Sequence, residues 1–243
     1  MALRSSNDPD WNLEKCCESV EYVFMAFYFF YIVANFVLWN SVFIKPMKLV
    51  AVFVHEMGHA TACWITGGKV NKIEVYDNEG GVTEFQGGCR CLVIPAGYVG
   101  GAFWGGFLVA MSGNRIGSTV SAGVFVLANI VTLFYSPNST LVKVSVFFII
   151  VTGIFMFLDW YVYDPILQYV TLYYGVTIGF FSVYDIYDDL ITRTVEGSDA
   201  HACHQLIPCC FPRCVGVQFI IVALAFQALG LYFALLWLVQ ENE

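Results

Sequence analysis

The chain has 243 residues, of which 58% are hydrophobic and 12% are charged, and its formal net charge is −8. A soluble domain is typically about 45–50% apolar and about a quarter charged. This much apolar surface does not fit one water-soluble core, so the composition predicts an integral membrane protein whose apolar surface faces lipid. The acidic balance argues against nucleic acid as a partner, because no basic stripe is available to neutralise phosphates.

The chain divides into a polar tail and one membrane domain. Residues 1–20 are polar, mixed in charge and without the pattern of a cleavable targeting segment, and residues 21–239 are expected to form a single multi-pass domain. A membrane-spanning helix needs about 20 mostly apolar residues. Seven segments meet this need, near residues 22–43, 46–66, 92–111, 116–135, 142–163, 165–186 and 215–239. The expected fold class is an all-α integral membrane protein with about seven transmembrane helices.

A short β-hairpin is expected between the second and third segments, at residues 70–88. Here β-branched and aromatic residues lie among polar ones and surround the run Asn78-Glu79-Gly80-Gly81. Glycine adopts the positive φ that tight turns need, so this run is predicted to be the turn of the hairpin.

Basic residues predict the orientation in the membrane. If the amino terminus lies in the cytosol and seven spans alternate, the opposite side holds only Lys45, Lys48 and Arg115 among the basic residues. This bias agrees with the positive-inside rule. Every cysteine except Cys63 would then face the reducing cytosol, and we expect free thiols there.

The second segment contains the residues most suited to chemistry, in the run His55-Glu56-Met57-Gly58-His59. Residues four apart on a helix share one face, so the two imidazoles can reach one ion. Neutral imidazole is a common Zn²⁺ ligand, and Glu56 is expected to act as general base on a water activated by the metal. Ionisable residues at membrane depth are costly and usually mark function.

A catalytic zinc normally has three protein ligands, so an acidic residue is expected beside the two histidines. Asp185 fits best, because the second and sixth segments run in the same direction towards the same side of the membrane. Asp188 is the reserve candidate one turn further on. The alternative is that Asp185, Asp188 and Asp189 belong to a solvated helix end. Asp199 is expected outside the hydrocarbon, where with Ser198 it suits a helix N-cap.

Glycines recur at roughly helical spacing in the third segment. Small residues at this spacing usually allow close packing between helices in a bilayer, and that role is expected here. Approach of an extended substrate to the metal is the alternative. The residues are Gly97, Gly100, Gly101, Gly105 and Gly106.

Several short runs together carry a family resemblance. They are His55-Glu56-Met57-Gly58-His59-Ala60, Thr66-Gly67-Gly68-Lys69, Gly80-Gly81-Val82-Thr83, Pro95-Ala96-Gly97-Tyr98-Val99-Gly100 and Ser198-Asp199-Ala200. They resemble the intramembrane zinc metallopeptidases related to the site-2 proteases, and more narrowly the short "B-like" subgroup of bacteria, fungi and plants. The resemblance covers about residues 46–238.

The resemblance implies a zinc metalloendopeptidase with His55 and His59 as ligands and Glu56 as the catalytic residue. It implies cleavage of a membrane protein or peptide within or next to the lipid bilayer. One feature departs from the wider family, which places its third ligand in a Leu-Asp-Gly motif, because Leu158-Asp159 is followed here by Trp160.

Two other functions remain open. A member without proteolytic activity would act as a membrane binding protein or chaperone, as the absent Leu-Asp-Gly motif suggests. A transporter would use the same buried polar residues to line an ion path.

Overall fold

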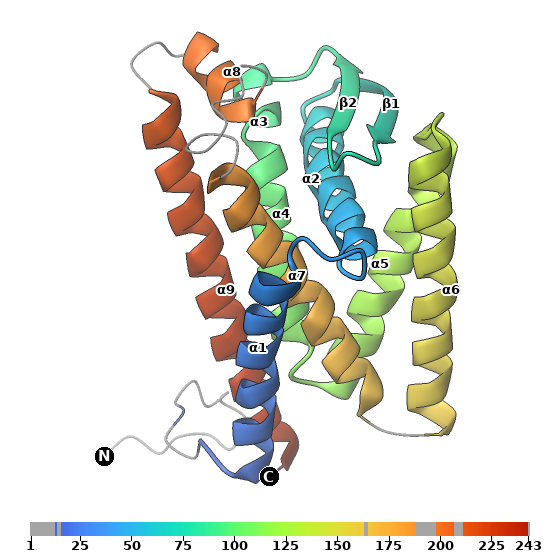
Figure 1. The fold of residues 1–243 in the computed structure, drawn as a ribbon, viewed down its shortest axis with the longest axis vertical. Helices are drawn as coiled ribbons and strands as arrows, with labels where there is room; N and C mark the ends of the chain where they lie inside the picture. The colour runs from blue at the N-terminus through green and yellow to red at the C-terminus, as the bar shows by residue number, and fades with distance from the viewer. Residues whose placement is uncertain (1–12, 14–15, 163–164, 188–197, 207–210, 243) are drawn as a thin grey trace, which may run out of the picture.

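A computed structural model of the chain describes residue 13 and residues 16–162, 165–187, 198–206 and 211–242. These residues form a bundle of helices with one two-stranded sheet at one end (Figure 1). The elements are α1 (Ser19–Leu38), α2 (Lys45–Ile65), β1 (Lys69–Val75), β2 (Gly81–Gln86), α3 (Arg90–Val93), α4 (Ala96–Met111), α5 (Arg115–Tyr135), α6 (Ser139–Tyr161), α7 (Ile166–Tyr187), α8 (Asp199–Leu206) and α9 (Pro212–Asn242).

All seven predicted hydrophobic segments fold into helices, namely α1, α2, α4, α5, α6, α7 and α9. Within the described residues, five of these are long and apolar enough to cross a membrane, and α4 is a shorter apolar helix. The remaining one, α2, carries the charged residues of the His-Glu run. The chain is therefore a multi-pass integral membrane protein, as its composition predicts.

Local signals explain where several helices begin. The side-chain oxygens of Asn114 and Asn138 accept the amide hydrogens of Gly117, at 2.9 Å, and Leu141, at 3.2 Å. Each bond satisfies one of the amide groups that the first turn of a helix leaves without a partner. Pro46 lies in the first turn of α2, where its missing N–H costs nothing.

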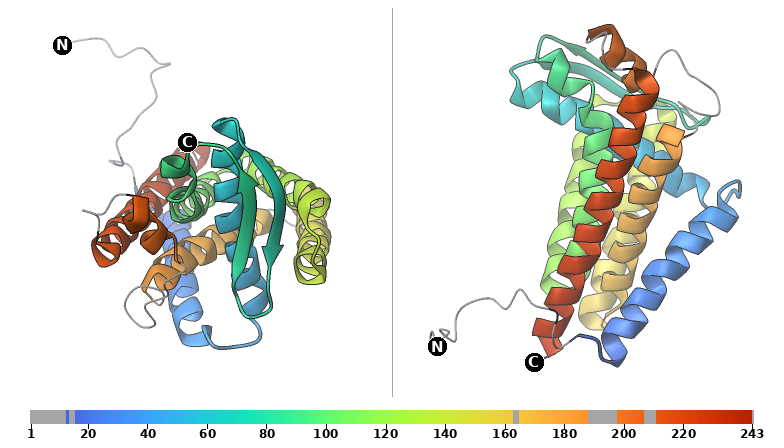
Figure 2. Two further views of the ribbon diagram at one scale, coloured as in Figure 1. Left: turned by 90° about the horizontal axis from the view of Figure 1, so that it is seen from above. Right: turned by 90° about the vertical axis from the view of Figure 1, so that its left-hand side faces the viewer.

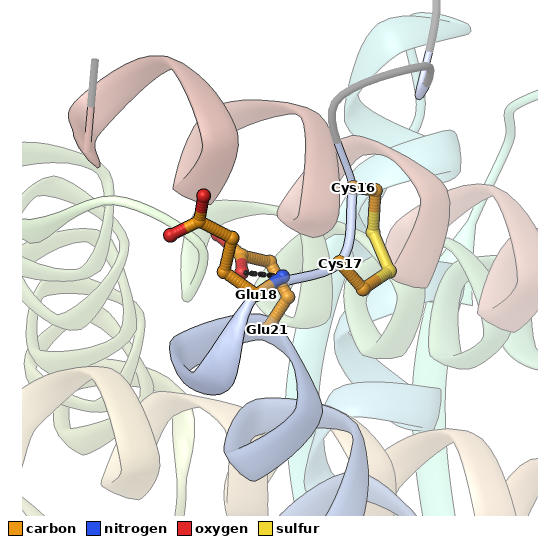
Figure 3. The surroundings of a disulfide bond; sticks show 4 residues. All are labelled: Cys16, Cys17, Glu18 and Glu21. Atoms are coloured by element: carbon orange, nitrogen blue, oxygen red, sulfur yellow. Dashed lines mark hydrogen bonds between the residues drawn. A yellow bond between two sulfur atoms is a disulfide. The ribbon is translucent and has the colours of Figure 1, made fainter.

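A disulfide joins Cys16 and Cys17 directly before α1 (Figure 3). The expectation of free thiols is wrong for this pair. The next residue, Glu18, is the N-cap of α1, and its backbone N–H donates to the Glu21 carboxylate at 2.8 Å.

The centre of the bundle is built around α2. Val50 and Phe53 of this helix are buried in one apolar cluster with Ile73 of β1 and Ile178 of α7. This packing fixes α2 on two sides, against the hairpin and against α7.

Glycines bring α4 close to α7 and α9. A Cβ atom at Gly105 would collide with the backbone of Gly179, and one at Gly106 would collide with the backbone of Phe226. Helices can approach this closely only where no side chain intervenes. The predicted packing role of the glycines is therefore confirmed for these two positions.

The predicted hairpin is confirmed. β1 and β2 pair antiparallel, with Lys69 opposite Gln86 and Val75 opposite Gly81. The hairpin lies along α2 (Figure 2), and Ile73 and Val75 of β1 are completely buried.

The turn of the hairpin differs from the expectation. Glu79 has the positive φ, 68°, while Gly80 and Gly81 do not have one. The Glu79 carboxylate oxygens lie 3.0 and 3.1 Å from Nζ of Lys48 on α2. Lys48 is only 5% exposed, and a buried ammonium group needs a counter-charge. This ion pair therefore fastens the turn to α2.

The two ends of the bundle carry different elements. The hairpin, α3 and α8 lie at one end, and the beginning of α1 and the end of α9 lie at the other (Figures 1 and 2). The expected change of side between the first two segments is wrong, because α2 continues in the general direction of α1 and lies nearer to the hairpin end. The beginning of α1 and the hairpin therefore lie at opposite ends of the bundle, so the expectation that both face the cytosol is wrong.

We expect the hairpin end to face the cytosol, because β1 and α3 begin there with Lys69 and Arg90. In sealed vesicles, a variant that keeps Cys89 as its only cysteine should react with an impermeant thiol reagent from the cytosolic side alone. Val162 directly follows α6, at the end of the bundle opposite the hairpin, and is 69% exposed. A matched variant with Val162→Cys as its only cysteine should react from the other side alone. Labelling of both from one side would contradict this orientation.

Candidate metal centre

Two histidines and one aspartate converge at the hairpin end of the bundle. His55 and His59 lie on one face of α2, as predicted, and their Nε2 atoms are 3.1 Å apart. Oδ2 of Asp199, the first residue of α8, lies 3.0 Å from each of these nitrogens. Among the described residues, these three form a group that could hold a metal ion.

The size of this triangle suits a small divalent ion. Ligands at about 2.0–2.1 Å from a tetrahedral zinc lie about 3.3 Å from one another. The three atoms are 3.0 to 3.1 Å apart, so a small outward adjustment would give zinc distances. Three protein ligands also leave a fourth position for water or substrate.

The hydrogen bonds around the triangle leave its atoms available to a cation. Nδ1 of His59 lies 2.7 Å from the backbone oxygen of Val93. Donation of the ring proton to this oxygen leaves the lone pair on Nε2. Oδ2 of Asp199 is buried and accepts no hydrogen bond. A buried carboxylate oxygen in this state is costly. A metal ion would satisfy it, so these residues fit one.

Asp199 is held in its charged form. Its burial acts to raise the pKa, but in the metal-free site the protonated forms of His59 and His55 outweigh this effect and keep the pKa of the carboxyl well below its usual value; a metal ion would take the place of their Nε2 protons. The ionised carboxylate is the form that binds a metal.

The position of Asp199 depends on how α8 packs. Its neighbour Ala200 is completely buried in a cluster with Tyr98 of α4 and Ile186 of α7. The backbone oxygen of Ser198 accepts the first hydrogen bond of α8 at 3.0 Å. A helix therefore begins at the run Ser198-Asp199-Ala200, as predicted. Ser198 lies directly before the helix, and Asp199 is its first residue and faces α2.

The third member of the group corrects the sequence prediction. The structure places Asp199 against the histidines, where the sequence favours Asp185. Asp185 lies near the end of α7, which runs in the same general direction as α2 (Figure 1), and lines the same cavity. Asp188 lies outside the described residues. The difference arises because α8 folds back over the end of the bundle, so a residue beyond the sixth span returns to the site.

Asp159, the aspartate of the Leu158-Asp159-Trp160 run, has a different place. It is buried at the other end of α6, where Oδ1 accepts the amide hydrogen of Leu167 at 2.9 Å. Its Oδ2 lies 3.4 Å from Nε of Arg115 at the beginning of α5. Asp159 therefore joins α5, α6 and α7 and lies away from the two histidines.

Glu56 is buried beside the group of two histidines and Asp199, on the turn that carries His55. The hydroxyl of Thr83 on β2 lies 2.6 Å from its Oε2. Sequence analysis identified Glu56 but missed Thr83. The signal in the sequence that could have pointed to Thr83 is its place in the family run Gly80-Gly81-Val82-Thr83. That run does not show which residue the Thr83 side chain contacts.

The centre opens into a cavity of about 990 Å³. This volume lies at the upper end of the range of roughly 300–1,000 Å³ for ligand sites. The walls come from the α1–α2 connection, α2, the hairpin, the beginning of α4, the end of α7 and α8, and include Trp39, Lys48, Val82, Tyr98, Tyr184 and Asp185.

The fold and the site together define a multi-pass membrane protein with a His-His-Asp group that could hold a metal ion at one end of its bundle. A family model described as Peptidase M50B-like matches residues 28–230, and the chain belongs to this family. The resemblance seen in the sequence is thereby confirmed. No curated protein and no solved structure matched the chain.

We expect the purified protein to bind about one divalent metal ion per chain, since the part of the chain that the structure describes contains one group of three candidate ligands. Asp199→Asn should sharply lower the metal content measured by elemental analysis, because it removes the anionic ligand while keeping the side-chain size. Asp185→Asn is the matched control and should keep the metal. Loss of metal from the control alone would show that the assignment of Asp199 is mistaken.

Gly97 of α4 is expected to be needed for metal binding. A Cβ atom there would collide with Nε2 of both His55 and His59. Gly97→Ala should therefore reduce the metal content by pushing α4 or the imidazoles aside. Gly123→Ala places the same methyl group in open space on α5 and should leave the metal content unchanged. Circular dichroism of both variants would check that the helices persist. Full metal content in Gly97→Ala would argue against the described geometry.

Proposed function

We propose that this protein is a zinc metallopeptidase that hydrolyses peptide bonds of membrane-associated substrates within or next to the bilayer. The observation that carries the proposal is a buried carboxylate, Glu56, beside the group formed by His55, His59 and Asp199. The opening of this group into a large cavity and the membership of the Peptidase M50B-like family support it.

Each residue has a role in the proposed reaction. His55, His59 and Asp199 would hold Zn²⁺, which when bound lowers the pKa of a coordinated water to about 7 and polarises a carbonyl oxygen. Glu56 takes a proton from the attacking water and passes it to the departing amide nitrogen. Because Glu56 directly follows His55 on α2, its distance from the reacting atoms is set by a single turn of helix.

The position of the hairpin is the evidence for a substrate that binds as an extended strand. β2 lines the cavity with Val82, Thr83 and Phe85. A segment unwound from a helix has backbone groups without partners, and these are costly in an apolar environment. A strand edge can satisfy them by adding the segment to the sheet. We therefore propose that the scissile segment lies extended beside β2.

The alternative of a protein that lacks proteolytic activity depends on the missing Leu-Asp-Gly motif. Asp199 weakens that argument, because it supplies a carboxylate at the two histidines from another part of the chain. A zinc-bound protein that cleaves no substrate would still favour a binding or chaperone role.

The test uses the full chain in proteoliposomes with a library of transmembrane peptides, and mass spectrometry detects the products. Glu56→Gln should keep its zinc and lose about 10²–10⁴-fold in cleavage rate, the usual contribution of a general base. His55→Ala should lose both zinc and cleavage. Wild-type activity in Glu56→Gln would rule out the proposed mechanism.

A further inference from the structure

Strand β2 encloses the carboxylate of Glu56. The Thr83 hydroxyl lies 2.6 Å from Oε2, and a Cβ atom added at Gly81 would collide with Oε1 and with Cγ. Gly81 does not have a positive φ. Its lack of a side chain therefore provides space for Glu56, and the hairpin and the carboxylate are fitted to each other at two points.

The Thr83 hydroxyl has two acceptors within reach and one proton to donate. Its oxygen lies 2.6 Å from Oε2 of Glu56 and 3.0 Å from the backbone oxygen of the same residue. Hydrogen bonds to a carboxylate are shorter and stronger than those to a neutral oxygen. The proton therefore goes to the carboxylate. This bond restrains the carboxylate about its terminal torsion, while the remaining lone pairs can still accept a proton from water.

The strand that carries Thr83 is itself fastened to α2 at both ends of the hairpin. At the turn, Glu79 forms an ion pair with Lys48 at 3.0 Å. Beyond the base, the amide hydrogen of Cys89 is donated to the Thr66 hydroxyl, 3.0 Å away, just after α2 ends. Thr83 is thus held in a fixed position relative to the helix that carries Glu56.

From these contacts we infer that Thr83 is a positioning residue for Glu56, which holds the carboxylate in the orientation that proton transfer requires. The inference rests on the proposed peptidase function, in which Glu56 is the general base. Misplacement of a reacting group by about 1 Å can cost on the order of 100-fold in rate. A single hydrogen bond that fixes a carboxylate therefore has a measurable effect on turnover.

The first test separates turnover from binding. Thr83→Val replaces the hydroxyl with a methyl group of similar size. With a library peptide that the wild type cleaves, it should lower kcat by roughly 10- to 100-fold, with KM and zinc content unchanged. Thr83→Ser restores the hydroxyl and should recover most of kcat. Tyr76→Phe is the matched control: it removes a hairpin hydroxyl that bonds Glu74 at 2.7 Å and should leave kcat unchanged.

The second test needs neither zinc nor a substrate. In the metal-free protein, the infrared difference spectrum between the wild type and Glu56→Gln isolates the carboxylate stretching band of Glu56. Thr83→Val should shift this band, because the carboxylate loses its hydroxyl donor. Thr83→Ser and Tyr76→Phe should leave the band where the wild type has it.

The outcomes are distinct. A band shift together with a fall in kcat that Thr83→Ser reverses supports the positioning role. An unchanged kcat, or a fall accompanied by loss of zinc, would overturn it, because Thr83 would then only hold the hairpin in place or do nothing. If the wild type cleaves no peptide, the peptidase function fails and the catalytic role of Thr83 fails with it. The band shift would then report the contact alone.

Discussion

The convergence of one carboxylate and two imidazoles at the end of a membrane bundle is the interaction on which the site depends. Each group alone would be costly to bury. Together, the negative charge of Asp199 and the two nitrogens of α2 form a set that a cation completes. The packing of Ala200, the bond from His59 to Val93 and the absence of a side chain at Gly97 all serve this one arrangement.

The bundle combines an apolar outer surface with a polar site in its interior. Its outer surface is apolar, as on α1 and α6, where large side chains such as Phe36 and Ile150 are exposed and suited to lipid. Its interior must bring polar groups together, and glycines make this possible by letting α4 pack tightly against α2, α7 and α9. The same helix that fills the centre of the bundle therefore also forms a wall of the metal centre.

The hairpin adds a second set of contacts around Glu56. A helix alone places Glu56 beside the histidines, but it leaves the long side chain free to rotate. β2 restrains that side chain with Thr83, and Lys48 and Glu79 fasten the hairpin to the helix. In the proposed peptidase, an edge strand that also lines the cavity would couple the binding of an extended substrate to the orientation of Glu56.

The sequence by itself determined the features that depend on neighbouring residues. Hydropathy found all seven helices, the i, i+4 spacing placed His55 and His59 on one face, and local alternation found the hairpin. Only the tertiary structure decided which carboxylate completes the centre, how α1 and α2 follow each other, and that Thr83 reaches Glu56. The first and the third depend on where α8 and β2 return to the centre of the bundle, and the second depends on where the connection between α1 and α2 returns the chain. Such returns are set by packing contacts between distant segments, which no local pattern records.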